Sequence, residues 1–328
     1  MQAIVLVGGE GTRLRPLTAT VPKPALTIVD RPFLAYMIEW LATHGVTEVV
    51  LACGFLPDIL REALAGEEER AGVRIRYVVE PEPRGTAGAI RFAADELGDD
   101  LDERFFALNG DVLTDLDLSA LLRAHEERGA RATIGLHPVE DSSAYGLVRL
   151  GTEGGVEAFL EKTGEPVPGE INAGMYVLQR SVLEMIEPGS NVSIERDIFP
   201  RLTGDGLYGA LLKGYWMDIG TPERYLQASW DILEGAVKTQ VRPSGPGLLV
   251  AADAEVAADA AIEPPAVLGP GCRVEGGAEI RSSVLLDGCV VGAGARIAGS
   301  ILGPGVQVGA GATLDGDVVG GNEQVPAP

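Results

Sequence analysis

A glycine-rich segment followed by basic residues, close to the start of the chain, has the residue types that bind a polyphosphate. The apolar run Ala3 to Val7 leads into Gly8-Gly9-Glu10-Gly11-Thr12, and Arg13, Arg15 and Lys23 fall within eleven positions. Glycines directly after a strand let the backbone approach a phosphate and direct N–H groups at it. The alternative is an ordinary turn with solvated basic residues, but three clustered cations in an acidic protein favour a polyphosphate site.

This segment matches neither of two common phosphate-binding fingerprints. A dinucleotide-binding GxGxxG sequence that began at Gly9 would need a third glycine at the position of Leu14. A P-loop would continue with Gly-Lys-Ser or Gly-Lys-Thr, which does not follow here. The segment instead holds Lys23 between two prolines, which fix the position of its ammonium group at little entropic cost.

Several motifs together resemble those of one enzyme family. The segment from Leu6 to Thr18, with Pro22-Lys23-Pro24, resembles the signature of the sugar-1-phosphate nucleotidylyltransferases, the nucleotide-sugar pyrophosphorylases. Further segments agree in order and spacing: Gly85-Thr86-Ala87-Gly88, Asn109-Gly110-Asp111, Phe159-Leu160-Glu161-Lys162, Ile171 to Tyr176, and Trp216 to Pro222. The resemblance covers the whole chain, and within the family it is strongest to the short mannose-1-phosphate guanylyltransferases. It implies a Rossmann-like nucleotidyltransferase domain.

The reaction that the resemblance implies is attack by a sugar-1-phosphate oxygen on the α-phosphorus of a nucleoside triphosphate, which releases pyrophosphate. The nucleophile is already an anion, so no general base is needed, which agrees with only three histidines, none near a motif. Two polyanions must still meet in line while charge builds on the leaving group. The resemblance makes Asp111 and Asp218 ligands of Mg²⁺, Arg13 a partner of the pyrophosphate, and Lys23 a partner of the α-phosphate or the sugar phosphate. Without it, each aspartate would be interpreted as a turn or N-cap residue.

The other candidate residues form a nucleotide set and a sugar-phosphate set. The nucleotide set is Val7, Gly8, Gly9, Gly11, Thr12, Arg13, Glu80, Gly85, Thr86 and Ala87. Within it, Glu80 is expected to accept from guanine N1 and N2, and the helix beginning at Thr86 is expected to offer free N–H groups. The sugar-phosphate set is Lys23, Asn109, Gly110, Gly146, Glu161, Lys162, Asn172 and Gly174. Here the Asn172 amide is expected to bind sugar hydroxyls, although Asn172 and Gly146 alone could equally form turns, and Glu161-Lys162 could be an exposed pair.

Alternating strand and helix patterns must position these residues. Apolar runs of strand length lie at Ala3 to Val7, Thr47 to Ala52, Val73 to Val79 and Phe105 to Leu108, and Val156 to Glu161 follows. Helical periodicity spans Leu34 to Leu41, Thr86 to Leu97 and Leu118 to Arg128. This alternation predicts an α/β fold with a doubly wound, mostly parallel sheet, whose ligands bind at the carboxyl ends of the strands.

The C-terminal part has a different pattern, a repeat of 17 residues. Val274, Val291 and Val308 are in step with Gly271, Gly288 and Gly305, and apolar residues recur every sixth position between them. This pattern resembles the hexapeptide left-handed β-helix, a triangular coil with one inward side chain on each short face. Cys272 and Cys289 should then stack in adjacent coils, as buried thiols rather than as a disulfide. We expect a catalytic domain at 1–235, a linker at 236–250, the β-helix at 251–320 and a frayed tail at 321–328.

The composition limits the partners and the compartment. The net charge of -22 disfavours extended binding to nucleic acid or to an anionic membrane. Three scattered cysteines do not form a disulfide framework, and neither a long apolar run nor a basic secretory leader is present. We therefore expect a cytoplasmic enzyme whose partners are a nucleoside triphosphate and a sugar 1-phosphate, and a homo-oligomer that involves the β-helix.

Three alternatives remain open at the level of sequence. The same chemistry could use another pair, such as a thymidylyl- or uridylyltransferase for glucose 1-phosphate, or a guanylyltransferase for another sugar-like phosphate. A non-catalytic regulatory subunit would not need Arg13, Lys23, Asp111, Lys162 and Asp218 together. An acetyltransferase role for the β-helix would need a base such as histidine, and all three histidines lie outside the repeat.

Overall fold

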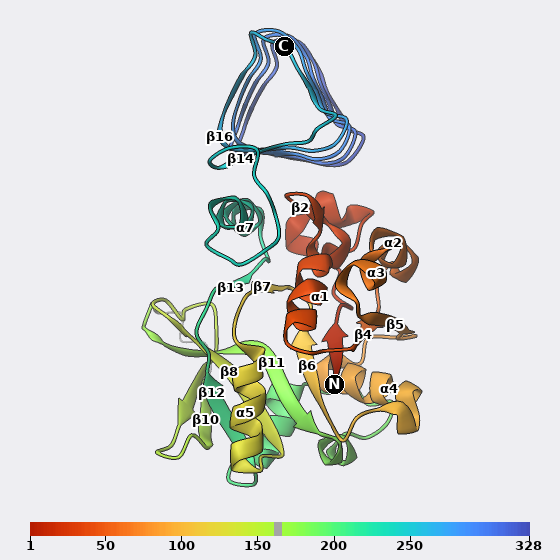
Figure 1. Cartoon of the computed structure of the whole chain (residues 1–328), viewed down its shortest axis with the longest axis vertical. Helices are drawn as coiled ribbons and strands as arrows, with labels where there is room; N and C mark the ends of the chain where they lie inside the picture. The colour runs from red at the N-terminus through yellow and green to blue at the C-terminus, as the bar shows by residue number, and fades with distance from the viewer. Residues whose placement is uncertain (161–165) are drawn as a thin grey trace. The chain divides into compact units, whose positions relative to one another are not determined.

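The computed structural model describes residues 1–160 and 166–328. In it the chain packs as two compact units (Figure 1). Unit 1 comprises Met1–Gly9 and Met37–Trp216, and unit 2 comprises Glu10–Tyr36 and Met217–Pro328. Helix α1 (Phe33–Thr43) begins in unit 2 and ends in unit 1.

A nine-stranded sheet forms the body of unit 1. One half is parallel, in the order β6 (Arg104–Asn109), β1 (Gln2–Leu6), β4 (Glu48–Cys53) and β5 (Arg74–Val79). In the other half, β11 (Gly169–Gln179) runs antiparallel to β6, β8 (Ala132–Val139) and β9 (Leu147–Leu150), while β10 (Val156–Leu160) pairs with β9 and β12 (Leu207–Leu211) with β8. A separate two-stranded pair consists of β7 (Val112–Thr114) and β13 (Trp216–Asp218). The predicted α/β architecture is confirmed, and the antiparallel half is an addition that the apolar runs did not reveal.

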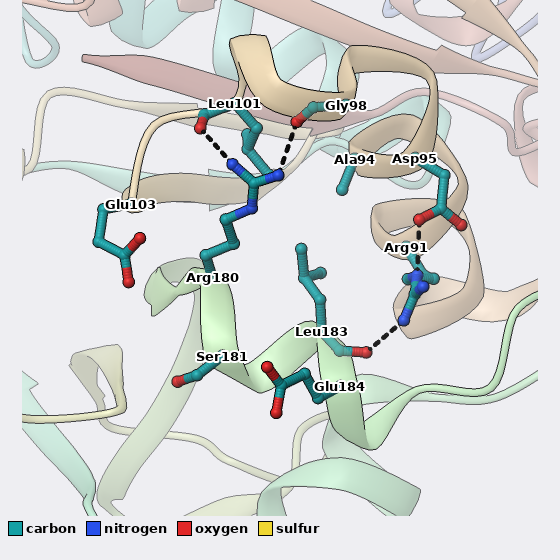
Figure 2. A pocket seen from close by; sticks show the side chains of 10 residues that line it. All are labelled: Arg91, Ala94, Asp95, Gly98, Leu101, Glu103, Arg180, Ser181, Leu183 and Glu184. Carbon is teal, nitrogen blue, oxygen red and sulfur yellow. Dashed lines mark hydrogen bonds and ion pairs between the residues drawn. The ribbon is translucent and has the colours of Figure 1, made fainter.

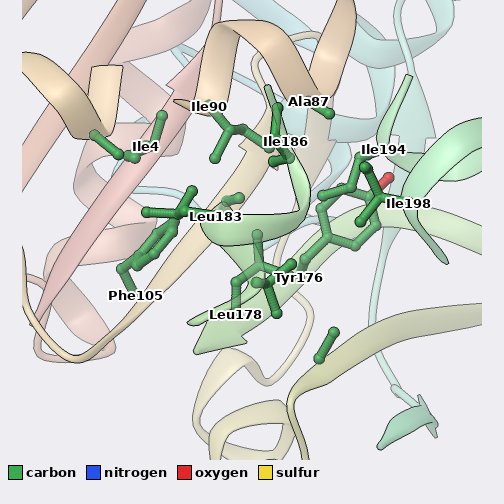
Figure 3. Close-up of a cluster of buried hydrophobic side chains, with 14 of the residues drawn as sticks. Ile4, Ala87, Ile90, Phe105, Tyr176, Leu178, Leu183, Ile186, Ile194 and Ile198 are labelled. Atoms are coloured by element: carbon green, nitrogen blue, oxygen red, sulfur yellow. The ribbon is translucent and has the colours of Figure 1, made fainter. Parts of the chain in front are cut away.

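The parallel strands are apolar because they are covered on both faces. Every residue of β4 is buried, including the methylene stem of Glu48 at its start. A cluster of buried side chains packs the sheet against α4 (Gly85–Leu97), η5 (Arg180–Met185) and η6 (Ile194–Ile198). Figure 3 shows Phe105 and Tyr176 among these side chains. The core therefore fixes the strand ends after which the candidate residues lie.

The helices of unit 1 begin and end at recognisable signals. Helix α5 (Leu118–Arg128) begins after Asp117, whose carboxylate accepts from the Ala120 N–H, and stops at Gly129 with a φ of 55°. The predicted helices at Leu34 to Leu41, Thr86 to Leu97 and Leu118 to Arg128 correspond to α1, α4 and α5. Shorter helices complete the unit: α2 (Pro57–Ala63), α3 (Glu67–Ala71), η4 (Gly98–Asp100) and α6 (Phe199–Leu202).

The N-terminal part of unit 2 contains three single-turn 3₁₀ helices, η1 (Thr12–Leu14), η2 (Leu17–Ala19) and η3 (Lys23–Ala25). A small hairpin of β2 (Thr27–Ile28) and β3 (Arg31–Pro32) follows. Helix α7 (Pro222–Glu234) packs on this hairpin, because the buried Tyr225 donates its hydroxyl proton to the carbonyl of Thr27. The segment that follows β1 is thus held by a helix far along the chain.

The C-terminal part of unit 2 is a parallel β-helix, whose triangular coils are visible at the blue end of the chain in Figure 1. One sheet contains β14 (Leu248–Val250), β16 (Ala261–Leu268), β18 (Glu279–Leu285), β20 (Arg296–Ala298), β21 (Ile301–Leu302), β23 (Thr313–Asp315) and β24 (Val318–Val319). Another contains β15 (Glu255–Val256), β17 (Arg273–Val274), β19 (Val290–Val291), β22 (Gln307–Val308) and β25 (Gln324–Val325). Val274 pairs with Val291, and Val291 with Val308, which confirms the 17-residue repeat.

The β-helix is longer than the repeat pattern predicted at both ends. Strand β14 lies inside the stretch expected as linker (236–250), and β25 lies inside the expected tail (321–328). The prediction of a frayed tail is wrong, because β25 pairs with β22 and Val325 packs on the apolar interior of the coil.

Across the described ranges, no helix combines the length and the hydropathy that crossing a membrane would require.

Candidate active site

The carboxyl ends of β1 and β6 meet closely in unit 1. The Gly110 N–H donates to the Leu6 carbonyl at 2.9 Å. A Cβ atom on Gly110 would lie 2.7 Å from that carbonyl oxygen and 2.6 Å from Val7 Cγ1, so only glycine fits there. Gly9, by contrast, has no atom within 4 Å of the position of a Cβ. Val7 and Gly110, which were predicted from separate motifs, therefore share one edge of the sheet.

Gly8 lies against the segment that follows β4, at a distance that a Cβ atom would tolerate. The Gly54 backbone nitrogen, which follows β4, lies 3.6 Å from the position of a Cβ on Gly8. The Val7 N–H donates to the Ala52 carbonyl at 3.0 Å and so continues the β1–β4 pairing beyond β1. The backbone of the predicted nucleotide segment is thus held from both sides before it enters unit 2.

Two candidate cations gather around Asp218 in unit 2. Lys23 is 8% exposed, and its Nζ lies 3.8 Å from Asp218 Oδ1. The Arg13 guanidinium lies against Gly220, where a Cβ would be 2.7 Å from Nη2. Arg224 also pairs with Asp218, at 3.8 Å from Oδ2. The structure brings Arg13, Lys23 and Asp218 together, from two motifs that are far apart in sequence.

Gly11 shapes the turn that presents these cations, just before Thr12 begins η1. Gly11 has a φ of 62° and precedes η1, and a Cβ there would lie 3.0 Å from Lys23 Cβ. The Thr18 hydroxyl donates to the Gly11 carbonyl at 2.8 Å and closes the turn. Arg15 points elsewhere, because its exposed guanidinium pairs with Glu10 at 3.2 Å.

The sugar-phosphate candidates of unit 1 are in close contact. Gly174 has a φ of 72°, and a Cβ there would lie 2.7 Å from Asn109 Nδ2. Asn172 Oδ1 accepts from the Gly174 N–H at 2.9 Å, and its Nδ2 donates to the Tyr176 hydroxyl at 2.9 Å. Both ends of the Asn172 amide thus have internal partners, which leaves one N–H and one lone pair for a sugar hydroxyl. The internal role of Asn172 was not predicted.

The prediction of free N–H groups at the start of α4 is wrong for Ala87 and Gly88. The N–H groups of Ala87 and Gly88 both donate to the Val192 carbonyl, at 3.0 and 3.4 Å. The connection between η5 and η6 therefore caps α4. Because the accepting carbonyl lies more than a hundred residues later in the chain, this cap cannot be predicted from the sequence around α4.

Glu80 lies just beyond β5 and is hydrogen-bonded to Arg84, which directly precedes α4. Its Oε2 accepts from the Arg84 N–H at 3.3 Å, and its own N–H donates to the Cys53 carbonyl at 2.8 Å. Burial raises the pKa of the Glu80 carboxyl from its usual value. Gly85 and Thr86 follow, at the first turn of α4.

Sequence reasoning missed an aromatic cluster beside the sugar-phosphate candidates. The His137 ring stacks on Trp216 with 5.7 Å between centroids, and Tyr145 meets Trp216 edge-on at 5.4 Å. Trp216 Nε1 donates to the Ala173 carbonyl at 2.9 Å. The statement that no histidine lies near a motif is therefore wrong for His137. Burial lowers the pKa of His137, so its imidazole is neutral at pH 7.

Four other candidates remain, and the structure describes two of them. The position of a Cβ on Gly146 lies 3.2 Å from the Leu160 carbonyl oxygen, which supports close approach of the backbone. Asp111 follows β6 and is near enough to Tyr176 to contribute to the raised pKa of that phenol. Glu161 and Lys162 lie outside the described residues.

Among the described residues, no group of three or more His, Cys, Asp or Glu side chains has the arrangement of a metal site. The chemistry of the two candidate ligands nevertheless fits Mg²⁺, which prefers carboxylate oxygens and keeps several water or phosphate ligands.

A pocket on unit 1 contains none of the predicted site residues. It lies between α4, η4 and η5, and two arginines dominate its lining (Figure 2). Arg180 donates to the carbonyls of Gly98 and Leu101, and Arg91 donates to the carbonyl of Leu183. Because both guanidinium groups already bind the chain itself, this pocket is part of the packing of η5 on α4.

Comparison with known families places this geometry in context. Residues 2–235 match the family model described as nucleotidyl transferase, and residues 245–326 match the model described as GMPPB C-terminal domain. The chain belongs to the nucleotidyl transferase family, and it is an enzyme of that class.

The more particular resemblance is to mannose-1-phosphate guanylyltransferases, as the motifs predicted. The enzyme of that name from Mycobacterium tuberculosis is 40% identical over 290 residues, which cover 88% of this chain and 78% of the relative. Mannose-1-phosphate guanyltransferase from Schizosaccharomyces pombe is 40% identical over 83% of this chain and 74% of its own. The crystal structure of HddC from Yersinia pseudotuberculosis, also solved in complex with GMP-PN, superposes with a TM-score of 0.61 at 28% identity, over 70% of this chain and 99% of HddC.

Proposed function

We propose that this chain transfers GMP from GTP to mannose 1-phosphate, which yields GDP-mannose and pyrophosphate. The names of the relatives at 38–40% identity support the substrate pair. The single structural observation that carries the chemistry is the convergence of Arg13 and Lys23 on the turn at Asp218 to Gly220. A buried ammonium and a guanidinium are suited to bringing two phosphate groups together.

In this mechanism the protein neutralises and orients rather than transferring protons. The sugar phosphate oxygen attacks the α-phosphorus as an anion, so no side chain needs to remove a proton. Lys23 binds the α-phosphate or the sugar phosphate, and its 8% exposure limits competition from water. Arg13 binds the departing pyrophosphate through its planar pair of N–H donors.

We propose that Asp111 and Asp218 are ligands of Mg²⁺. When bound, the ion supplies positive charge to the triphosphate. Two carboxylates leave positions for phosphate oxygens and water, as the octahedral preference of Mg²⁺ requires.

The binding sets of the sequence remain proposals for this reaction. For the nucleotide these are Val7, Gly8, Gly9, Gly11, Thr12, Arg13, Glu80, Gly85, Thr86 and Ala87. For the sugar phosphate they are Lys23, Asn109, Gly110, Gly146, Glu161, Lys162, Asn172 and Gly174. The clash that a Cβ would create at Gly85, Gly110 and Gly174 supports the assignment of these segments to rigid walls of a site.

The test is pyrophosphate release with Mg²⁺, in which GTP, ATP, UTP and dTTP are each combined with mannose 1-phosphate and glucose 1-phosphate. Release mainly with GTP and mannose 1-phosphate is the expected result. Preference for another pair would keep the chemistry and replace the product, whereas no release with any pair would favour the regulatory-subunit alternative.

The Asp218→Asn variant tests the metal assignment. We expect turnover to fall by orders of magnitude with the fold intact, because a metal ligand is lost. Glu234→Gln, at the exposed end of α7, is the matched control and should retain normal turnover. Near-normal Mg²⁺-dependent activity of the Asp218 variant would contradict the assignment.

We propose that residues 1–235 hold the catalytic residues and that the β-helix serves assembly and stability. The ends of a β-helix expose unpaired backbone groups and apolar side chains, which favours their burial against a second copy of the chain. A chain that ends after Glu234 should keep its α/β far-UV spectrum but change its mass by light scattering or its melting temperature. If that chain cannot fold under any condition, the boundary is wrong.

A further inference from the structure

One carboxylate that no motif singled out, Glu195 on η6, receives hydrogen bonds from two binding segments. The Thr86 hydroxyl, at the start of α4, donates to Glu195 Oε2 at 2.9 Å. The Tyr176 hydroxyl, on β11, donates to Glu195 Oε1 at 3.0 Å. Tyr176 in turn accepts from Asn172 Nδ2, and Ser193 donates to Glu195 Oε2 at 2.7 Å. Thr86, Asn172, Tyr176 and Glu195 form what we call the Glu195 network.

The direction of every hydrogen bond in the Glu195 network is determined. The Gly174 N–H needs an acceptor, so Asn172 turns Oδ1 to Gly174 and Nδ2 to Tyr176. The Tyr176 oxygen therefore accepts from Asn172, and its only proton must go to Glu195. The same reasoning holds at Thr86, whose oxygen accepts from the Ile194 N–H at 2.8 Å and whose proton is left for Glu195.

Only an ionised carboxylate satisfies this set of donors. Three hydroxyl protons converge on the two oxygens of Glu195, which can accept all of them. A glutamine amide would turn an N–H pair toward hydroxyls that must themselves donate, so at least one bond would be lost. Tyr176 is fully buried, and burial together with the Glu195 charge raises the pKa of its phenol well above the usual value.

The Glu195 network reaches both sides of the proposed reaction. Through Thr86 it fixes the first turn of α4, beside Gly85 and Ala87 of the nucleotide set. Through Tyr176 it fixes the Asn172 amide, which holds Gly174 against Asn109 in the sugar-phosphate set. All of these residues belong to unit 1.

We propose that Glu195 is a positioning residue that couples the nucleotide segment to the sugar-phosphate segment. Because the Glu195 carboxylate holds both segments, a substrate that orders one segment on binding also orders the other. Each substrate should then lower the KM of its partner. This inference rests on the proposed function, because it takes the two segments to be the binding segments of that reaction.

The test is Glu195→Gln, with Asp197→Asn as the matched control. Asp197 lies on the same turn and accepts from the Ser193 N–H at 2.7 Å, an interaction that asparagine retains, and it is outside the Glu195 network. We expect Glu195→Gln to raise the KM for GTP and for mannose 1-phosphate together, each about tenfold, with a smaller effect on kcat. Asp197→Asn should match the wild type.

A second variant keeps the proposal testable if Glu195→Gln does not fold. Tyr176→Phe keeps the ring that packs edge-on against Phe199 at 5.0 Å and removes only the hydroxyl. It should raise both KM values as well, and in the double variant the two effects should be clearly less than additive, because both substitutions break the same connection. A purely structural role would lower stability and leave both KM values of the folded protein unchanged, and that result overturns the proposal.

Amide hydrogen exchange tests the coupling without any activity. In Glu195→Gln, residues 85–88 and 172–176 should both exchange faster than in the wild type and in Asp197→Asn. Faster exchange in only one of these segments overturns the coupling. If the wild type releases no pyrophosphate with any substrate pair, the proposed function fails, and this exchange result still decides whether Glu195 joins the two segments.

Discussion

Gly85 and Gly72 share the same positive φ, which isolates a steric constraint at the start of α4. Both have a φ of 67°. A Cβ on Gly85 would lie 2.6 Å from the Val192 carbonyl oxygen and 2.9 Å from Asn191 Oδ1, whereas a Cβ on Gly72 would have no atom within 4 Å. Replacing each by alanine therefore imposes the same left-handed strain, and only Gly85→Ala adds a clash.

The magnitudes follow from these two terms. The left-handed conformation costs about 1 kcal/mol for alanine at either position. The clash adds about 1–3 kcal/mol, as overpacking does elsewhere. The Val192 carbonyl cannot retreat cheaply, because it accepts from the Ala87 N–H at 3.0 Å and the Val192 N–H donates to the Arg84 carbonyl at 3.0 Å. Gly85→Ala should lose about 2–4 kcal/mol of unfolding free energy, against about 1 kcal/mol for Gly72→Ala.

Urea unfolding of the two variants, followed by circular dichroism with equal slopes, measures this difference. Pyrophosphate release measures its effect on the nucleotide segment, where Gly85→Ala should raise the KM for GTP and Gly72→Ala should not. If the two variants lose the same stability, the contact with Val192 is not a rigid constraint, and the account of how α4 begins is wrong.

Two further predictions concern buried titratable groups. Burial lowers the pKa of His125 to about 4 from 6.5, so protonation favours the unfolded chain and stability falls as the pH drops from 6.5 to 4. Urea midpoints from pH 7 to 4 should show the wild type losing about 3 kcal/mol more than His125→Gln. Burial likewise raises the pKa of the Cys53 thiol to about 12, and Cys272 and Cys289 are at most 1% exposed. Ellman's reagent should therefore detect no thiol in the native protein and three in urea.

The sequence predicted best the features that depend on neighbours in the chain. Strands β1 and β4 were readable because parallel strands buried on both faces need uninterrupted apolar runs. The 17-residue repeat was readable because each coil stacks on the next in register. The glycine-rich segment was readable because close approach to phosphate demands particular residue types at particular positions.

What the sequence did not reveal depends on pairings between distant segments. His137 reaches Trp216 because β8 pairs with β11, where His137 lies opposite Ile171. Glu195 lies in Ser193-Ile194-Glu195-Arg196, which has no distinctive composition. The proposed role arises only because the hydroxyl groups of Thr86 and Tyr176, from distant segments, donate to it beside the local Ser193 hydroxyl. Such convergence leaves no periodic signal in any one segment.

The division of the chain shows why motif and packing unit need not coincide. The motif from Leu6 to Thr18 crosses from unit 1 to unit 2 between Gly9 and Glu10. Tyr225 explains where the second part goes. Its hydroxyl donates to the Thr27 carbonyl, and burial together with the nearby Asp287 charge raises its pKa, so α7 is packed between the early segment and the β-helix. The turn that carries Arg13 is thereby tied to the C-terminal coils, where a Cβ on Gly320 would lie 3.3 Å from Pro16 Cβ. A boundary at residue 235 separates Glu10–Tyr36 from the β-helix, although both belong to unit 2. The sequence pattern shows where the 17-residue repeat begins, but it does not show these long-range contacts.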